Sequence, residues 1–338
     1  MKILIISPSI KPDLTGNAVT ADRLCSGLRD KGFQVVVEKN DSSGLEEAIR
    51  ALNPDLILAL HARKSGLIAL KLSERHNNIP YIVTITGTDL NIDIDKLHRV
   101  EVINVLEKAA AVIVPSSFAR ERLIHALPAI KEKVTHIKPS IRLEDQIIED
   151  RREIGDNSNI NFLLPAGIRK VKDPSFAIEP LDRLRKIFPQ ITLTVAGPIL
   201  EAKEWELFQE KSGSMDWITH EEVAHESMRS LYLKAHVVLN TSVSEGLANS
   251  ILEAMYFGKP VLASDCEGNR AVISNAIDGL LYKQGDMDDF LCQAERLLQD
   301  KDLGPSLGKM AGKKVKEEFS LDREIEKYAI TLKAAVRF

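Results

Sequence analysis

Short apolar runs alternate along this chain with longer stretches in which apolar residues recur at helical spacing. Runs of this length predict buried strands, because a parallel sheet covered on both faces is apolar on both sides of each strand. The predicted strands are residues 2–7, 34–37, 55–60, 81–86, 111–115, 161–165, 191–196, 237–240 and 261–264. Helical patterns follow most of them, which is typical of β-α units around parallel sheets.

Some helix boundaries have local signals. The pattern at 18–31 stops before Gly32, which is a plausible C-cap. Ser43 with Glu46 three residues later predicts a capping box for a helix ending at Leu52. Further helices are predicted from Asp173 and over three other ranges: 224–234, 249–257 and about 320–338.

The alternation weakens over residues 141–158, a charge-rich stretch that we interpret as an interdomain linker. A chain of 338 residues is also long for one hydrophobic core. We therefore predict an α/β protein with two Rossmann-like, doubly wound parallel-sheet domains, residues 1–145 and 146–338. Two such sheets imply a cleft, in which ligands bind at the carboxyl ends of the strands.

Composition excludes several classes of protein. The net charge is −4 and the sequence shows no basic patch, so no nucleic-acid partner is expected. Cys25, Cys266 and Cys292 are odd in number and far apart, which argues against a disulfide framework or a zinc site. The apolar run at the N-terminus is too short for a signal peptide or a transmembrane segment, so we expect a cytoplasmic protein.

The strongest chemical signal is the segment 242–255, which opens at the end of an apolar strand and continues into a helix. The backbone N–H groups of Gly246, Leu247, Ala248 and Asn249 are then expected at a helix N-terminus, where they suit a diphosphate or a sugar oxygen. Glu245 precedes that helix and Glu253 lies about two turns inside it, where a carboxylate can accept from both ribose hydroxyls. Two glutamates alone are more typical of an ordinary exposed helix.

Other candidates follow predicted strands. Gly16 and Asn17 lie where a glycine lets the backbone approach a ligand, although an ordinary turn has the same pattern. Arg169 and Lys172 can neutralise a leaving diphosphate, or can belong to a solvated basic loop. Five further residues follow two strands of the first domain and are candidates for the acceptor or sugar side, with a structural role for the histidine as the alternative: His61, Arg63, Thr86, Thr88 and Asp89.

Two patterns resemble metal sites and are rejected. Asp93 and Asp95 form a D-x-D pattern, but a helix N-cap is the better interpretation of either residue. His220 and His225 are five residues apart, so they would point in different directions on a helix. We expect neither a metal nor another cofactor.

The segment 242–264, with the run GKPV at 258–261, resembles the E-x7-E region of family-4 glycosyltransferases, which have the two-domain GT-B fold. Four blocks, TGNAVT at 15–20, GTDL at 87–90, VKDP at 171–174 and VSEG at 243–246, resemble the glycosyltransferase 1 domain-containing protein family. The resemblance implies that Glu253 binds the nucleotide ribose and that Glu245 lies near the donor sugar. Lys172 matches the lysine of the family's pattern better than Arg169 matches its arginine. The resemblance also implies that the final helix packs back toward the first domain.

The implied reaction is metal-independent transfer of a sugar, with retention at the anomeric carbon, from a nucleotide-sugar expected to be UDP-linked to an unknown acceptor. Three of these blocks, with HARKS at 61–65, are also similar to bacterial selenosugar synthases, which transfer a UDP-linked amino sugar to selenophosphate. A GT-B epimerase, a phosphorylase and a non-catalytic nucleotide-sugar-binding protein are the remaining alternatives.

Overall fold

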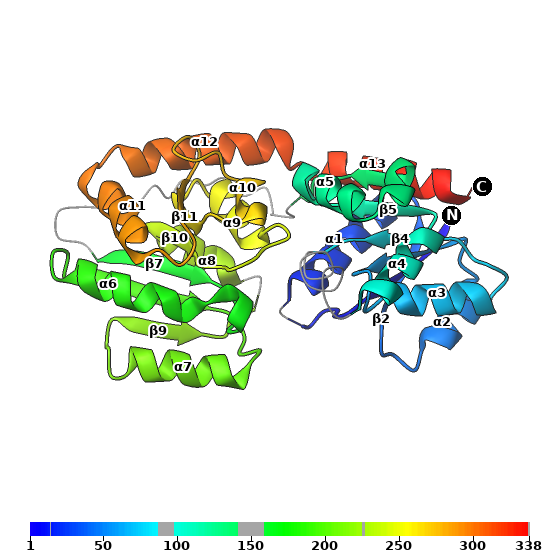
Figure 1. The fold of residues 1–338 in the computed structure, drawn as a ribbon, viewed down its shortest axis with the longest axis horizontal. Helices are drawn as coiled ribbons and strands as arrows, with labels where there is room; N and C mark the ends of the chain where they lie inside the picture. The colour runs from blue at the N-terminus through cyan, green and yellow to red at the C-terminus, as the bar shows by residue number, and fades with distance from the viewer. Residues whose placement is uncertain (14, 87–97, 141–158, 225–226, 337–338) are drawn as a thin grey trace. The chain divides into compact units, whose positions relative to one another are not determined.

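The structure is a computed structural model that describes residues 1–13, 15–86, 98–140, 159–224 and 227–336. The chain divides into two compact units, each built on one six-stranded parallel sheet (Figure 1). Unit 1 comprises residues 1–142 with 319–338, and unit 2 comprises residues 143–318. The expected class of two doubly wound parallel sheets is confirmed.

The sheet of unit 1 has the strand order β2-β1-β3-β4-β5-β6. Its strands are β1 Lys2–Ser7, β2 Gln34–Lys39, β3 Leu56–Leu60, β4 Tyr81–Thr84, β5 Ala111–Val114 and β6 Val134–His136. The helices are α1 Gly16–Asp30, α2 Leu45–Leu52, α3 Gly66–Arg75, α4 Arg99–Lys108, α5 Ser117–Ala126 and α13 Leu321–Val336.

The burial of strand β1 explains why its residues 3–6 are all apolar. Its side chains alternate between two fully buried faces of the sheet. Leu4 and Ile6 belong to the core formed with α2 to α5, whereas Ile3 and Ile5 belong to the core formed with α1 and α13. A strand covered on both faces therefore needs no polar position.

The sheet of unit 2 has the strand order β12-β11-β10-β7-β8-β9. Its strands are β7 Ile160–Pro165, β8 Ile191–Ala196, β9 Ile218–Glu221, β10 Val237–Asn240, β11 Val261–Ser264 and β12 Leu280–Tyr282. The α-helices are α6 Ile178–Arg185, α7 Ala202–Ser212, α8 Met228–Lys234, α9 Asn249–Tyr256, α10 Glu267–Arg270, α11 Met287–Gln299 and α12 Leu303–Glu318. Two 3₁₀ turns, η3 Lys170–Lys172 and η4 Pro174–Ala177, follow β7.

A buried polar cluster fixes α13 to the rest of unit 1. The Nε and Nη2 atoms of Arg23, on α1, donate to the two carboxylate oxygens of Glu324 at 3.0 and 3.2 Å. The backbone N–H and hydroxyl of Ser140 also donate to Glu324, the former at 2.9 Å. Both charged side chains are 2% exposed. The buried Glu324 carboxylate on α13 is thus hydrogen-bonded both to α1 and to residue 140.

Several local predictions change. The capping box at Ser43 is wrong: α2 begins after Gly44, one residue later, and a glycine has no side chain that could cap the helix. The Glu46 carboxylate is instead hydrogen-bonded by His76 at 2.9 Å. The helix from Asp173 is also wrong, since Asp173 has a φ of 40° between two 3₁₀ turns and α6 begins at Ile178. Gly32, by contrast, follows α1 with a left-handed φ of 83°, as a C-terminal glycine should.

The described part of the chain holds no helix both long enough and apolar enough to cross a membrane.

Candidate functional site

The strand order of unit 2 reverses between β7 and β10, which are parallel neighbours. From β7 the chain continues through β8 to β9, and it then returns to β10 and proceeds through β11 to β12 on the other side. In open α/β sheets, ligands bind at the carboxyl ends of the strands at such a reversal of strand order. Lys172 follows β7 and Glu245 follows β10.

Lys172 and Glu245 meet at this point, although they are 73 residues apart in sequence. The Lys172 Nζ donates to Glu245 Oε1, and the two side chains are 14% and 9% exposed. Two hydrogen bonds to backbone carbonyls hold their loops together: Thr241 Oγ1 donates to the Lys172 carbonyl at 2.8 Å, and the Val243 N–H donates to the Val171 carbonyl at 2.9 Å. The pair is thus held by the carboxyl ends of two adjacent strands.

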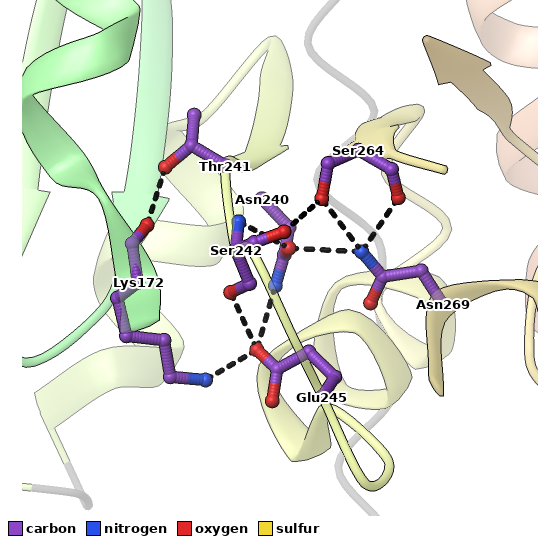
Figure 2. A network of polar contacts seen from close by, with 7 residues as sticks. All are labelled: Lys172, Asn240, Thr241, Ser242, Glu245, Ser264 and Asn269. Carbon is purple, nitrogen blue, oxygen red and sulfur yellow. Dashed lines mark hydrogen bonds and ion pairs between the residues drawn. The ribbon is translucent and has the colours of Figure 1, made fainter. Parts of the chain in front are cut away.

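Figure 2 shows that the same oxygen of Glu245 accepts from two further side chains. Ser242 Oγ donates to it at 2.6 Å and Asn240 Nδ2 donates at 3.3 Å. Burial alone would raise the pKa of the Glu245 carboxyl, but the Lys172 charge and these hydrogen bonds outweigh burial and hold that pKa below its usual value. Glu245 is therefore an anion in the neutral range.

Behind Glu245 lies a layer of buried polar residues that the sequence did not single out: Asn240, Ser264 and Asn269. Asn269 Nδ2 lies 3.0 Å from Asn240 Oδ1 and 2.9 Å from the Ser264 carbonyl oxygen. Ser264 Oγ donates to the Ser242 carbonyl at 2.6 Å. Small polar residues after strands look like ordinary loop residues, and only the fully buried setting of these three distinguishes them.

Glu253 lies on α9, as its spacing from Glu245 predicts. It is only 6% exposed, and its Oε2 accepts from the hydroxyl of the buried Tyr232 at 2.9 Å. Burial and the Glu253 charge raise the pKa of Tyr232, so this hydroxyl stays a donor. Glu253 is therefore not the exposed helix residue of the simpler interpretation.

The loop 246–248 leads into α9, which begins at Asn249 without a side-chain cap. The residue at the cap, Ala248, is 2% exposed and takes an extended conformation. Gly246 and Leu247 are half-buried. These backbone groups therefore lie at the start of a helix, as expected.

Arg169 begins the turn that carries Lys172, and the two residues differ in their contacts. Within the described ranges, the buried Nε of Arg169 has no hydrogen-bond partner. Lys172, unlike Arg169, is hydrogen-bonded to Glu245.

The described candidates of unit 1 lie in segments that follow its strands. Thr15 caps α1 by accepting from the Ala18 N–H, and a Cβ added at the exposed Gly16 would meet no atom within 4 Å. Packing within the protein therefore does not require a glycine at this position. Asn17, beside it, is half-buried.

His61 follows β3 and is 1% exposed, with a left-handed φ of 81°. Its Nδ1 accepts from the Lys64 N–H at 3.3 Å, and its carbonyl accepts from the N–H groups of Ser65 and Gly66. These bonds build the turn before α3, so they give His61 a structural role. Arg63, in this turn, and Thr86, after β4, are half-buried. Thr88 and Asp89 lie outside the described residues, as do Asp93, Asp95 and His225.

In the described ranges, no three His, Cys, Asp or Glu side chains are grouped so that they could hold a metal ion. His220 lies on β9 rather than on a helix, and its Nε2 is 2.8 Å from the Gly197 carbonyl oxygen.

Comparison with known proteins identifies relatives over the whole chain. A protein of Xenopus tropicalis named glycosyltransferase 1 domain-containing protein 1 is 27% identical over 330 residues, which cover 93% of each chain. The structure of Anabaena HepE with UDP and glucose aligns with a TM-score of 0.81 at 18% identity, covering 99% of this chain and 100% of that one. Sucrose-phosphate synthase of Thermosynechococcus elongatus aligns with a TM-score of 0.80 at 18% identity, covering 99% of each chain.

These two structures confirm the GT-B fold of the chain. The similarity to selenosugar synthases stays a prediction. Residues 146–315, which include Lys172, Glu245 and Glu253, match the family described as glycosyl transferases group 1. The chain belongs to this family and is a glycosyltransferase.

Proposed function

We propose that this glycosyltransferase takes its sugar from a UDP-linked donor, without a metal ion and with retention at the anomeric carbon. The observation that carries the proposal is the buried Lys172–Glu245 pair beside the loop that opens α9. It supplies a cation and an anion of fixed position at the strand-order reversal, where nucleotide ligands bind in open α/β sheets.

Each part of a nucleotide-sugar has a matching group in this arrangement. The first turn of α9 offers backbone N–H groups and the positive end of a helix dipole to the diphosphate. Lys172 neutralises the charge that develops on the leaving UDP. Glu253 accepts from the ribose hydroxyls, and Glu245 lies beside the sugar. UDP is also the nucleotide bound in the HepE structures, one with UDP and glucose and another with UDP-glucose.

The proposal is tested by incubating the protein with a panel of UDP-linked and other nucleotide-linked sugars, with water in the place of the unknown acceptor, and measuring release of the nucleoside diphosphate. UDP-sugars are expected to be consumed fastest. Retention is read by NMR from the anomeric coupling constant of the sugar first released, before it mutarotates. Consumption of ADP- or GDP-sugars alone would contradict the choice of UDP.

Metal independence gives a separate prediction. Chelation by EDTA is expected to change neither the affinity for UDP, measured by calorimetry, nor the rate of UDP-sugar consumption, because Lys172 and the α9 amides take the place of a divalent cation. Loss of both with EDTA and recovery with manganese would show that a metal ion bridges the diphosphate.

Glu253→Gln is expected to weaken UDP binding by about tenfold to a hundredfold, because hydrogen bonds to a charged group contribute roughly 1.5–3 kcal/mol. Calorimetry with UDP measures this loss. Glu206→Gln is the matched control, since Glu206 is an exposed glutamate on helix α7 of the same unit. Equal affinity in the wild type and in Glu253→Gln would place the ribose elsewhere.

A further inference from the structure

We propose that Asn269 is a positioning residue for sugar transfer: it fixes the orientation of the Asn240 amide and so directs the Asn240 Nδ2 at Glu245. This inference rests on the proposed role of Glu245 in the reaction. Asn269 is itself too deeply placed to touch a substrate, because it is 0% exposed on α10.

The surroundings of Asn269 determine which way its amide points. Its Nδ2 faces the Ser264 carbonyl oxygen at 2.9 Å, the Asn240 Oδ1 at 3.0 Å and the Ser264 Oγ at 3.2 Å. Ser264 Oγ donates its own proton to the Ser242 carbonyl at 2.6 Å, so it can only accept from Asn269. An oxygen at the position of Nδ2 would face these acceptors and be repelled.

Asn240 is oriented by Asn269 in the same way (Figure 2). Its Oδ1 accepts from Asn269 Nδ2 at 3.0 Å and from the Ser242 N–H at 3.1 Å. Two donors on this side require an oxygen there, and the Asn240 Nδ2 must then face Glu245 Oε1, which lies at 3.3 Å. The hydrogen bonds therefore run in one direction, from Asn269 through Asn240 to Glu245.

Helix α10 also contacts Glu245 directly. A Cβ added at Gly268 would lie 2.6 Å from the Glu245 Cβ, so the glycine is needed for this close packing. Residues 268 and 269 thus act on the same glutamate, the first through its backbone position and the second through Asn240. Because two neighbouring residues of α10 both act on Glu245, a positioning role for Asn269 is favoured over a role that merely links α10 to β11.

The test is the pKa of Glu245, measured by NMR on protein carrying ¹³C-carboxyl glutamate and assigned with Glu245→Gln. Among the described residues, Lys172 and the Cys266 thiol face Glu245. Burial raises the pKa of that thiol, so it stays neutral throughout the acid titration. Asn269→Ala is expected to raise the Glu245 pKa by about one unit, because the Asn240 Nδ2 is no longer held toward the carboxylate and its hydrogen bond is lost.

A double-mutant cycle shows whether Asn269 acts on Glu245 through Asn240 or only links α10 to β11. Asn240→Ala is expected to raise the Glu245 pKa as much as Asn269→Ala does, and the double variant no further. The matched control is Arg270→Ala, on the same helix, which removes an exposed ion pair with Asp265 and should leave the Glu245 pKa unchanged. An unchanged Glu245 pKa in Asn269→Ala, or additive rises in the double variant, overturns the proposal.

If Asn269→Ala does not fold, Asn269→Asp in the wild-type and Asn240→Ala backgrounds replaces it. The charge of the aspartate raises the Glu245 pKa in both backgrounds. In the wild-type background the Asn240 amide is also misdirected, which raises the Glu245 pKa further, and this additional rise is absent in the Asn240→Ala background. An equal rise in both overturns the proposal.

Steady-state kinetics give a second readout. In Asn269→Ala, kcat is expected to fall about tenfold, and the KM for the UDP-sugar is expected to change less than twofold. A wild-type protein that consumes no UDP-sugar contradicts the proposed function, while the Glu245 pKa still decides the role of Asn269.

Discussion

Replacing Glu245 by glutamine is expected to slow sugar transfer by about a hundredfold to a thousandfold, the usual cost of removing one preorganised electrostatic group from an active site. The wild-type carboxylate lies in a nearly buried contact with Lys172, where charges interact more strongly than in water. A contact made mainly in the transition state lowers turnover and leaves ground-state binding nearly intact. Steady-state kinetics should therefore show a lower kcat, and calorimetry an almost unchanged affinity for UDP.

The control for Glu245→Gln comes from the turn that carries its partner. Lys170→Met removes an exposed lysine two residues from Lys172 and is expected to keep wild-type turnover, whereas Lys172→Met should slow transfer as Glu245→Gln does. A Glu245→Gln enzyme within threefold of the wild type would remove this glutamate from the reaction.

The pH dependence follows from the same pair. The pKa of Glu245 is held below its usual value, so the carboxylate and its bond to Lys172 are present above that pKa and are lost as the pH falls through it. The acid limb of kcat that belongs to Glu245 is therefore expected below the usual range of a glutamate. It should disappear from the profile of Glu245→Gln.

Glu324→Ala is expected to destabilise unit 1 by about 3–5 kcal/mol, because it leaves the guanidinium of Arg23 buried without its counter-charge. The loss also removes the acceptor of the Ser140 N–H and hydroxyl. Both tryptophans, Trp205 and Trp217, belong to unit 2. Urea unfolding followed by far-UV circular dichroism should therefore shift to lower urea, while the tryptophan fluorescence transition should shift less.

Two variants bound the interpretation of Glu324→Ala. The double variant Arg23→Met with Glu324→Leu is expected to be more stable than Glu324→Ala, because it leaves no buried charge. Glu179→Ala, which breaks an exposed i,i+4 pair with Arg183, should change stability by less than about 0.5 kcal/mol. A Glu324→Ala protein as stable as Glu179→Ala would show that Arg23 finds another partner.

The sequence predicts the central strands and the edge strand β2, but it misses the edge strands β6, β9 and β12. Residues 3–6 are all apolar because helices cover both faces of their sheet, whereas residues 191–196 alternate buried apolar side chains with two half-buried threonines. The structure places β1 and β8 over these two segments. Strand β9 has the sequence ITHE and alternates between half-buried and exposed positions at a sheet edge, so it lacks that signal. Strand β6, with three residues, is too short to show a period.

For the candidate site, sequence spacing was enough to place Glu245 before α9 and Glu253 within it, because both residues belong to one continuous loop-and-helix segment. The contact between Lys172 and Glu245 depends on β7 and β10 being neighbours, which is a property of strand order and not of local sequence. The same holds for Asn269 on α10, whose partner Asn240 is 29 residues away at the end of strand β10.

The cluster around Glu324 also sets an order of events during synthesis. Unit 1 begins at the first strand, yet α13 follows the last helix of unit 2 in the chain. While the ribosome makes unit 2, Arg23 lacks its carboxylate and the sheet face that Ile3 and Ile5 help to form lacks the cover of Ile325, Tyr328 and Leu332. The domain that emerges first is therefore the one whose core is completed last.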